Sequence, residues 1–345
     1  MPFSFLVFSD FHYKQHMYAT TVEDLHRILA RAQAAKVDMI LHAGDFCNDF
    51  PGSPEVTELL LHNPQGLPVY GCYGNHDLET AGTAMTYVSP RMTNREVIWG
   101  TPDGRLGDCT IGHYYVDYQS YRIVMTDTNY SFNPDGYWEH NRTGSYCQPA
   151  GNTQHNSLGP EQLRWLEKVL TDAAKQGRRC IVVSHASFNE REGACPDHEN
   201  VRAVFARANA LQKGTVQLAI NGHYHSDNCT VVEDVIYLDV NAVRNAWWAV
   251  EHHGKYTDEF PTFPFVEYDE TGKPLGPATM RPFLSLRQGK HTLFTADPLS
   301  AIVTVDGNTV TVEGTTSRWV EDLAPNTDRT DIVPLIRNRT VTVAD

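Results

Sequence analysis

Residues 3–12 read FSFLVFSDFH, an apolar and aromatic run that leads directly into an aspartate and a histidine. Residues 216–225 read VQLAINGHYH and repeat this arrangement, with a glycine and two histidines after the run. Short apolar runs that end at polar or turn residues are typical of buried strands in a largely parallel sheet. The two segments therefore predict strands whose carboxyl ends carry chemically active side chains.

Similar runs predict further strands, with helical periodicity between several of them. The full set of expected strands is 3–9, 39–42, 68–72, 121–127, 180–184 and 216–221. One helix is predicted to begin at a capping box made by Thr20 and Glu23 and to continue to Ala35. A second is predicted to open at Pro160 and to stop at Gly177. This alternation predicts an α/β protein with a layered β-sheet core flanked by helices.

The chain divides into three regions by pattern. Residues 1–254 carry the alternating strands and helices and are expected to form the catalytic domain. Within them, residues 80–158 are rich in Gly, Asn and Tyr, and we expect an irregular insertion that forms a rim or lid. Residues 255–345 lose helical periodicity, and we expect a small β-rich extension packed on the core, with one hairpin turning at Asp306 and Gly307.

Composition limits the possible partners. The chain has 345 residues, 41% hydrophobic and 20% charged, as in ordinary folded proteins. A net charge of −14 disfavours nucleic acid and anionic membranes as partners. No window is apolar enough for a membrane span, and the first apolar run reaches Asp10 too early for a signal peptide. We therefore expect a cytoplasmic protein, or an exported one if a leader is missing, and its seven cysteines to be mostly reduced thiols.

Potential metal ligands follow five of the predicted strands. In chain order they are Asp10, His12, Asp45, Asn75, His185, His223 and His225. The carboxyl ends of strands in an open α/β sheet share one edge, which is where ligands bind. Oxygen and imidazole donors without thiolate suit ions such as Mn, Fe or Zn. Seven donors are too many for one ion that also holds water, so two ions sharing a carboxylate are expected.

A pair of ions about 3.5–4 Å apart is suited to phosphoester hydrolysis. Such ions lower the pKa of bound water and stabilise both the attacking and the leaving oxygen at phosphorus. They also neutralise the charge that otherwise repels a nucleophile from a phosphate. Hydrolysis by attack of a metal-bound hydroxide is therefore the expected reaction.

The whole series of motifs resembles the calcineurin-like metallophosphoesterase superfamily over residues 3 to 242. The resemblance implies that one ion is held by Asp10, His12 and His225, and that Asp45 bridges to the second ion. It further implies that the second ion is held by Asn75, His185 and His223. His76 is implied as the catalytic group that protonates the leaving oxygen or contacts the phosphoryl group, with Asp77 orienting its ring.

Several substrate classes are compatible with such a site. We expect a small phosphoester substrate, with phosphodiesters preferred and phosphomonoesters or nucleotide pyrophosphates as alternatives. A non-catalytic scaffold that keeps this fold to bind a protein is the alternative from another class. The presence of all seven candidate ligands and of His76 favours the enzyme over the scaffold.

Overall fold

The computed structural model describes most of the chain in segments. These are residues 2–13, 20–47, 53–78, 98–99, 105–106, 109–110, 113–141, 152–190, 194–250, 262–265, 279–282, 291–320, 325 and 329–343.

One sheet is built around the first strand of the chain. Its six strands run in the order β22-β21-β20-β1-β2-β3. Their bounds are β1 Phe3–Phe8, β2 Met39–His42, β3 Val69–Gly71, β20 Ala301–Asp306, β21 Thr309–Gly314 and β22 Arg339–Thr342. β1, β2 and β3 are parallel, whereas β20 pairs antiparallel with β1 along residues 3–7. The predicted hairpin at Asp306 and Gly307 thus lies in the same sheet as the amino-terminal strand.

A second sheet contains the remaining predicted strands. Its order is β14-β15-β13-β12-β8-β7-β4. The bounds are β4 Ile98–Trp99, β7 Tyr114–Tyr118, β8 Tyr121–Met125, β12 Arg179–Ser184, β13 Val216–Asn221, β14 Asn228–Val232 and β15 Val235–Asp239. The central strands β8, β12, β13 and β15 are parallel, and β7 and β14 are antiparallel to their neighbours.

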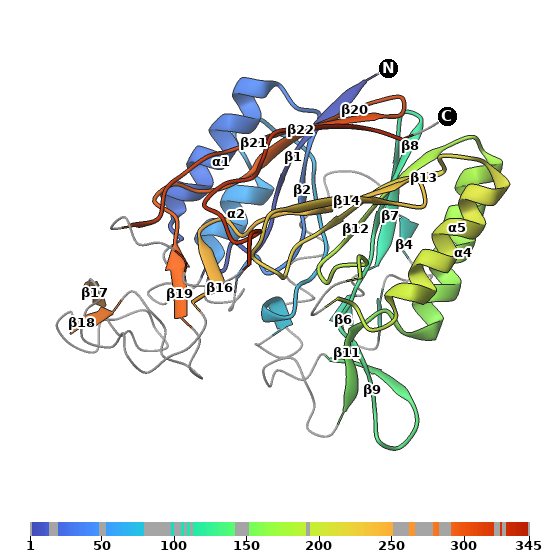
Figure 1. The fold of residues 1–345 in the computed structure, drawn as a ribbon, viewed down its shortest axis with the longest axis horizontal. Helices are drawn as coiled ribbons and strands as arrows, with labels where there is room; N and C mark the ends of the chain where they lie inside the picture. The colour runs from blue at the N-terminus through green and yellow to red at the C-terminus, as the bar shows by residue number, and fades with distance from the viewer. Residues whose placement is uncertain are drawn as a thin grey trace.

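Helices cover the outer faces of the two sheets, which pack against each other (Figure 1). The helices are α1 Val22–Ala35, α2 Pro54–Leu61, α4 Gly159–Lys175 and α5 His198–Leu211, with a short 3-10 helix η1 at His76–Leu78. The core between the sheets includes Phe5 and Leu41 from one sheet and Ile181 and Leu218 from the other. A second apolar cluster joins α1 and α2 to the first sheet, and a third joins α4 and α5 to the second. This layered arrangement confirms the predicted fold class.

The predicted start of the first helix needs a correction, whereas α4 begins within one residue of the predicted Pro160. The capping box of α1 is made by Thr21 and Asp24, not by Thr20 and Glu23. The Thr20 hydroxyl instead donates to the His12 carbonyl at 3.3 Å. At the start of α4, the carboxylate of Asp197 accepts from the amides of Leu158 and Gly159. That acceptor comes from a distant part of the chain, so local sequence could not indicate it.

The sequence predicts one strand within residues 80–158, and the structure contains several. Besides β4, β7 and β8, the described residues form β5 Arg105–Leu106, β6 Cys109–Thr110, β9 Tyr130–Phe132, β10 Trp138–His140 and β11 Thr153–Ser157. β9 lies between β10 and β11 in a small separate sheet. The rest of the predicted insertion lies outside the described residues, and the rim or lid stays a prediction.

The carboxyl-terminal region contains two further strand pairs and two ion pairs to Asp227. The remaining strands are β16 Asn245–Val250, β17 Thr262–Phe265, β18 Thr279–Pro282 and β19 His291–Phe294, paired as β16 with β19 and β17 with β18. Arg337 and Arg339 both pair with the buried carboxylate of Asp227, at 2.8 and 2.7 Å. Because Asp227 lies two residues after His225, these ion pairs fix the carboxyl-terminal segment beside the candidate ligands. The division at residue 254 stays a prediction.

Two further sequence expectations concern cysteines and membranes. Among the described cysteines, the free thiols are Cys47, Cys72, Cys180, Cys195 and Cys229. None of the helices in the described segments is long and apolar enough to cross a membrane.

Candidate metal centre

The structure brings the seven candidate ligands together at the ends of the strands from both sheets. Asp10 and His12 follow β1, Asp45 follows β2 and Asn75 follows β3. His185 follows β12, and the pair His223 and His225 follows β13. Side chains that are up to 215 positions apart in the chain therefore converge on one edge, as the strand pattern predicts.

The first group of donors is formed by Asp10, His12 and His225. One potential ligand atom from each lies within 4.8 Å of the other two, and all three residues are buried. His225 Nε2 lies 3.2 Å from Asp10 Oδ1 and 3.2 Å from His12 Nε2. This group coincides with the first predicted ligand set.

The second group is formed by Asp45, His185 and His223, with Asn75 beside it. His185 Nε2 lies 3.0 Å from Asp45 Oδ2, 3.2 Å from Asn75 Oδ1 and 3.1 Å from His223 Nδ1. Asp45 Oδ2 also lies 3.6 Å from His12 Nε2 of the first group. The Asp45 carboxylate therefore stands between the two groups, where a bridging ligand is expected.

Backbone carbonyls orient two of the histidines. His185 Nδ1 lies 2.8 Å from the Ala43 carbonyl, and His225 Nδ1 lies 2.8 Å from the Asn245 carbonyl. A carbonyl only accepts, so each Nδ1 carries a proton, and each Nε2, once deprotonated, is the lone-pair donor that faces the centre. Both imidazoles are thus held in the tautomer that binds a cation.

Five of the candidate ligands have left-handed backbone. The φ angles are 51° at Asp10, 48° at His12, 53° at Asp45, 69° at His223 and 50° at His225. Each such residue costs on the order of 1–3 kcal/mol, and strained residues of this kind cluster at active sites. The strain is a second, independent indication that this edge is functional.

Glycines let the turns approach the ligands closely. A Cβ on Gly222 would lie 2.7 Å from Asp10 Oδ2 and 2.9 Å from the Ala43 carbonyl. A Cβ on Gly74 would lie 2.6 Å from Asp45 Cγ. All three distances are below ordinary van der Waals contact, which is about 3.5–4.0 Å between carbons. Only glycine fits at these two positions.

His76 lies beside both donor groups. Its ring nitrogen is within 4.8 Å of ligand atoms of His12 and Asp45, and its ring centroid lies 4.9 Å from that of His12. The His76 amide donates to Asp45 Oδ1 at 2.7 Å, which fixes the backbone of this residue against the carboxylate between the groups. The position is compatible with its predicted contact to a phosphoryl or leaving oxygen.

The hydrogen bonds of Asp77 indicate a role in holding the loops. Its two oxygens accept from the amides of Asp45, Phe46, Cys47 and Gly74 at 2.8–3.2 Å. Burial raises the pKa of Asp77 to about 8, the Asp45 carboxylate adds to this, and the amides of Gly74 and Cys47 oppose it. These four bonds join the turn after β2 to the turn after β3. Orientation of the His76 ring by Asp77 stays a prediction.

The electrostatics of the centre favour cations. Burial alone would raise the pKa of Asp10, but His225, His12 and His185 hold that pKa well below its usual range. Likewise, His185 and His76 keep the pKa of Asp45 low against the effect of burial. Burial would lower the pKa of His185, yet the Asp45 carboxylate raises it to about 9. Two buried carboxylates thus stay ionised.

The donor set fits a pair of metal ions. Asp10 Oδ1 is buried and faces imidazole nitrogens, His225 Nε2 at 3.2 Å and His12 Nε2 at 3.7 Å, without a backbone or hydroxyl donor. Its other oxygen accepts from Ser9 Oγ at 2.6 Å and from the His223 amide at 2.9 Å. A buried carboxylate oxygen that lacks such a donor is costly, and a cation removes that cost. Carboxylate, amide and imidazole donors suit borderline ions such as Mn, Fe or Zn.

Some contacts of the candidate centre have no signal in the sequence. The Ala43 and Asn245 carbonyls are backbone atoms, and the Asn156 side chain comes from β11, far from any motif. Ser9 stands directly before Asp10, and a hydroxyl next to a buried carboxylate could have suggested the bond between them.

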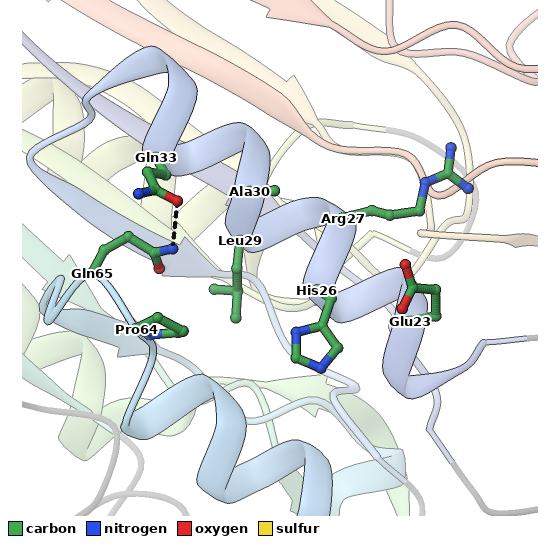
Figure 2. A pocket seen from close by; sticks show the side chains of 8 residues that line it. All are labelled: Glu23, His26, Arg27, Leu29, Ala30, Gln33, Pro64 and Gln65. Atoms are coloured by element: carbon green, nitrogen blue, oxygen red, sulfur yellow. Dashed lines mark hydrogen bonds between the residues drawn. The ribbon is translucent and has the colours of Figure 1, made fainter.

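A hollow elsewhere on the surface is lined by none of the candidate metal ligands. Figure 2 shows it along α1 and the turn after α2, where Gln33 and Gln65 are joined by a hydrogen bond of 3.2 Å.

Comparisons with known proteins agree with the geometry. A family model described as calcineurin-like phosphoesterase matches residues 3–227. The chain is similar to the crystal structure of a dimetal phosphatase from Danio rerio, with 14% sequence identity and a TM-score of 0.57 over 99% of both chains. It is also similar to GAP50, described as the anchor in the inner membrane complex of Plasmodium, with 10% identity and a TM-score of 0.50 over 96% of this chain and 91% of that one. These two likenesses show a shared fold. A search of curated proteins gave no match.

Proposed function

This chain belongs to the calcineurin-like phosphoesterase family, and from that premise we propose that it hydrolyses small phosphodiesters at a centre of two metal ions. The family supports metal-dependent phosphoester hydrolysis. The preference for diesters, the identity of the ions as Mn, Fe or Zn, and a cytoplasmic location are parts of the proposal.

One observation carries this proposal above the others. The Asp45 carboxylate lies 3.0 Å from His185 Nε2 on one side and 3.6 Å from His12 Nε2 on the other. A single buried carboxylate between two clusters of imidazoles is the arrangement that two ions need in order to share a ligand. A purely structural ion pair would not need a histidine from each side.

The seven candidate ligands fall into two sets, one for each proposed ion. Asp10, His12 and His225 would hold one ion, Asn75, His185 and His223 the other, and Asp45 would join them. When bound, such a pair supplies charge that neutralises the phosphate and lowers the pKa of the attacking water.

The chain itself supplies the remaining contributions. His185 and His225 are oriented by the carbonyls of Ala43 and Asn245, so no reorganisation is needed as charge develops. His76 would donate a proton from its ring nitrogen to the leaving oxygen, or a hydrogen bond to the phosphoryl oxygen. Negative net charge, at −14, supports a small substrate over a nucleic acid.

Turnover of bis(p-nitrophenyl) phosphate with added Mn²⁺ tests the proposal, with Asp45→Asn as the comparison. We expect two ions per wild-type chain and a loss of activity in the variant of at least about a hundredfold, because the shared ligand is weakened. Equal rates for both proteins would contradict catalysis at this centre and favour a protein-binding scaffold. Faster turnover of p-nitrophenyl phosphate or of a nucleotide pyrophosphate would instead assign the monoesterase or the pyrophosphatase.

The role of His76 has its own test. His76→Ala should leave the metal content unchanged and should slow esters with poor leaving groups more than nitrophenyl esters, because only poor leaving groups need a proton. An equal loss on both kinds of substrate would contradict proton donation by His76.

A further inference from the structure

His223 differs from the other oriented histidines of the centre in what faces its outer nitrogen. Its Nδ1 points inward, 3.1 Å from His185 Nε2, so Nδ1 is the atom available to a cation. Its Nε2 points away from the centre and lies 3.5 Å from Nδ2 of Asn156. The contact reaches from the end of β13 to β11, 67 positions earlier in the chain.

The partner of His223 therefore comes from a different structural layer. His185 and His225 are oriented by carbonyls of the core, at Ala43 and Asn245. Asn156 belongs to β11, which pairs with β9 in the small sheet outside the two main sheets. The Asn156 side chain, which lies within the predicted insertion, thus faces His223 in the way that backbone carbonyls face His185 and His225.

The backbone of β11 is shaped so that Asn156 reaches the histidine. The register with β9 shifts between Thr153 and Ser157, and within this bulge Gln154 and Asn156 have φ angles of 52° and 65°. Bulges next to active sites commonly turn a side chain in a new direction. Left-handed backbone at two residues that are not glycine costs on the order of 1–3 kcal/mol each. An ordinary strand would avoid this strain.

We propose that Asn156 is a positioning residue that holds His223 in its metal-binding tautomer, an inference that rests on the proposed function. When Nδ1 of His223 binds a cation, Nε2 carries the proton and needs an acceptor. A half-turn of the Asn156 amide brings Oδ1 to the place of Nδ2, where it accepts that proton, because the two ends of an amide have nearly the same shape. The small sheet thereby acts on the second metal site.

The chemistry sets the expected size of the effect. Partners of this kind typically change metal affinity by about 10–100-fold. Among the described residues of the centre, Asn156 contacts His223, which belongs to the group of Asp45 and His185, so one of two binding events should weaken. The first group, Asp10, His12 and His225, should bind as before.

Calorimetric titration of the metal-free full chain with Zn²⁺ tests this proposal. Asn156→Ala should weaken one of the two binding events about 10–100-fold, and Asn156→Asp, which keeps an acceptor oxygen, should restore it. Gln154→Ala is the matched control, since this residue is exposed and also has left-handed backbone. It should bind both ions as the wild type does.

A double-mutant cycle shows whether the effect passes through His223. In a His223→Ala background, Asn156→Ala should change Zn²⁺ affinity no further, because the imidazole to be positioned is gone. An equal loss in both backgrounds would overturn the proposal. So would unchanged Zn²⁺ affinity in Asn156→Ala with a raised KM, which would make Asn156 a substrate contact.

The two proposals fail separately. A wild-type chain that binds fewer than two Zn²⁺ ions would contradict the proposed function. A wild type that binds two ions, with Asn156→Ala indistinguishable from it, would contradict only the positioning role.

Discussion

Replacing Gly74 with alanine should remove metal from the centre while leaving the fold intact. The new Cβ would lie 2.6 Å from Asp45 Cγ, and it would overlap still more with Asp45 Oδ1 and the Asp45 amide. An ordinary contact between carbons is about 3.5–4.0 Å, so Asp45 or the turn must move by about 1 Å. Metal sites tolerate changes of only about 0.2 Å in ligand distance. Because Asp45 stands between both donor groups, both sites should suffer.

The expected result is a chain that holds clearly fewer than two ions and turns over bis(p-nitrophenyl) phosphate about a hundredfold more slowly. Overpacking should also cost about 1–3 kcal/mol of stability, which leaves a cooperative melting transition. Elemental analysis, the turnover assay and thermal melting of the metal-free protein measure these three effects. Gly66→Ala is the control: its φ is 62°, and a Cβ there meets nothing within 4 Å. A Gly74→Ala protein with two ions and wild-type turnover would refute this reasoning.

Three other predictions concern His185 of the centre, the buried His113 and the ion pairs of Arg122. Metal binding at pH 7–8 should release at least about one proton per chain, because Asp45 raises the pKa of His185 to about 9 and that proton must leave as the ion binds. Affinity should therefore rise with pH up to about 9, and calorimetry in buffers of different ionisation enthalpy should detect the released proton; binding without proton release would contradict this. Burial lowers the pKa of His113 to about 4, so the stability that comes from keeping it neutral is present above about pH 6.5 and is lost as pH falls toward 4. The free energy of unfolding, measured with denaturant, should therefore fall between pH 7 and pH 5, and His113→Phe should reduce that fall by up to about 2 kcal/mol. An unchanged pH profile in the variant would contradict this. Arg122→Met should cost about 2–3 kcal/mol, because this side chain is 2% exposed and pairs with Asp117 and Asp172, whose partial exposure keeps the cost below that of a fully buried network. Arg207→Met, which breaks the exposed pair with Glu167, should cost less than about 1 kcal/mol. Equal losses of stability in the two variants would be inconsistent with a role for burial.

The positions of the candidate ligands could be predicted because each one follows an apolar strand. Asp10 and His12 directly follow β1, and His223 and His225 follow β13, so their meeting at one edge follows from strand direction alone. The predicted bounds of Met39–His42 and Val216–Asn221 agree with β2 and β13, because uninterrupted apolar runs leave few alternatives.

Other features depend on groups that are not neighbours in the sequence. The short strands β9, β10 and β11 were not predicted, since three- to five-residue segments rich in polar residues carry no clear periodicity. Thr21 and not Thr20 caps α1, and the choice between two adjacent threonines depends on the carbonyl of His12, to which Thr20 donates.

The amino-acid sequence by itself determined the class of fold, the candidate donor residues and the edge at which they meet, because strand runs and the residues after them are local properties. Only the tertiary structure decided which nitrogen of His185 and of His225 faces the centre, since that depends on the carbonyls of Ala43 and Asn245 as acceptors. It also decided that β20 completes the sheet beside β1 and that Asp45 stands between the two groups. Hydrogen bonds and strand pairings between distant segments form only when the chain has folded, and no periodicity in the sequence encodes them.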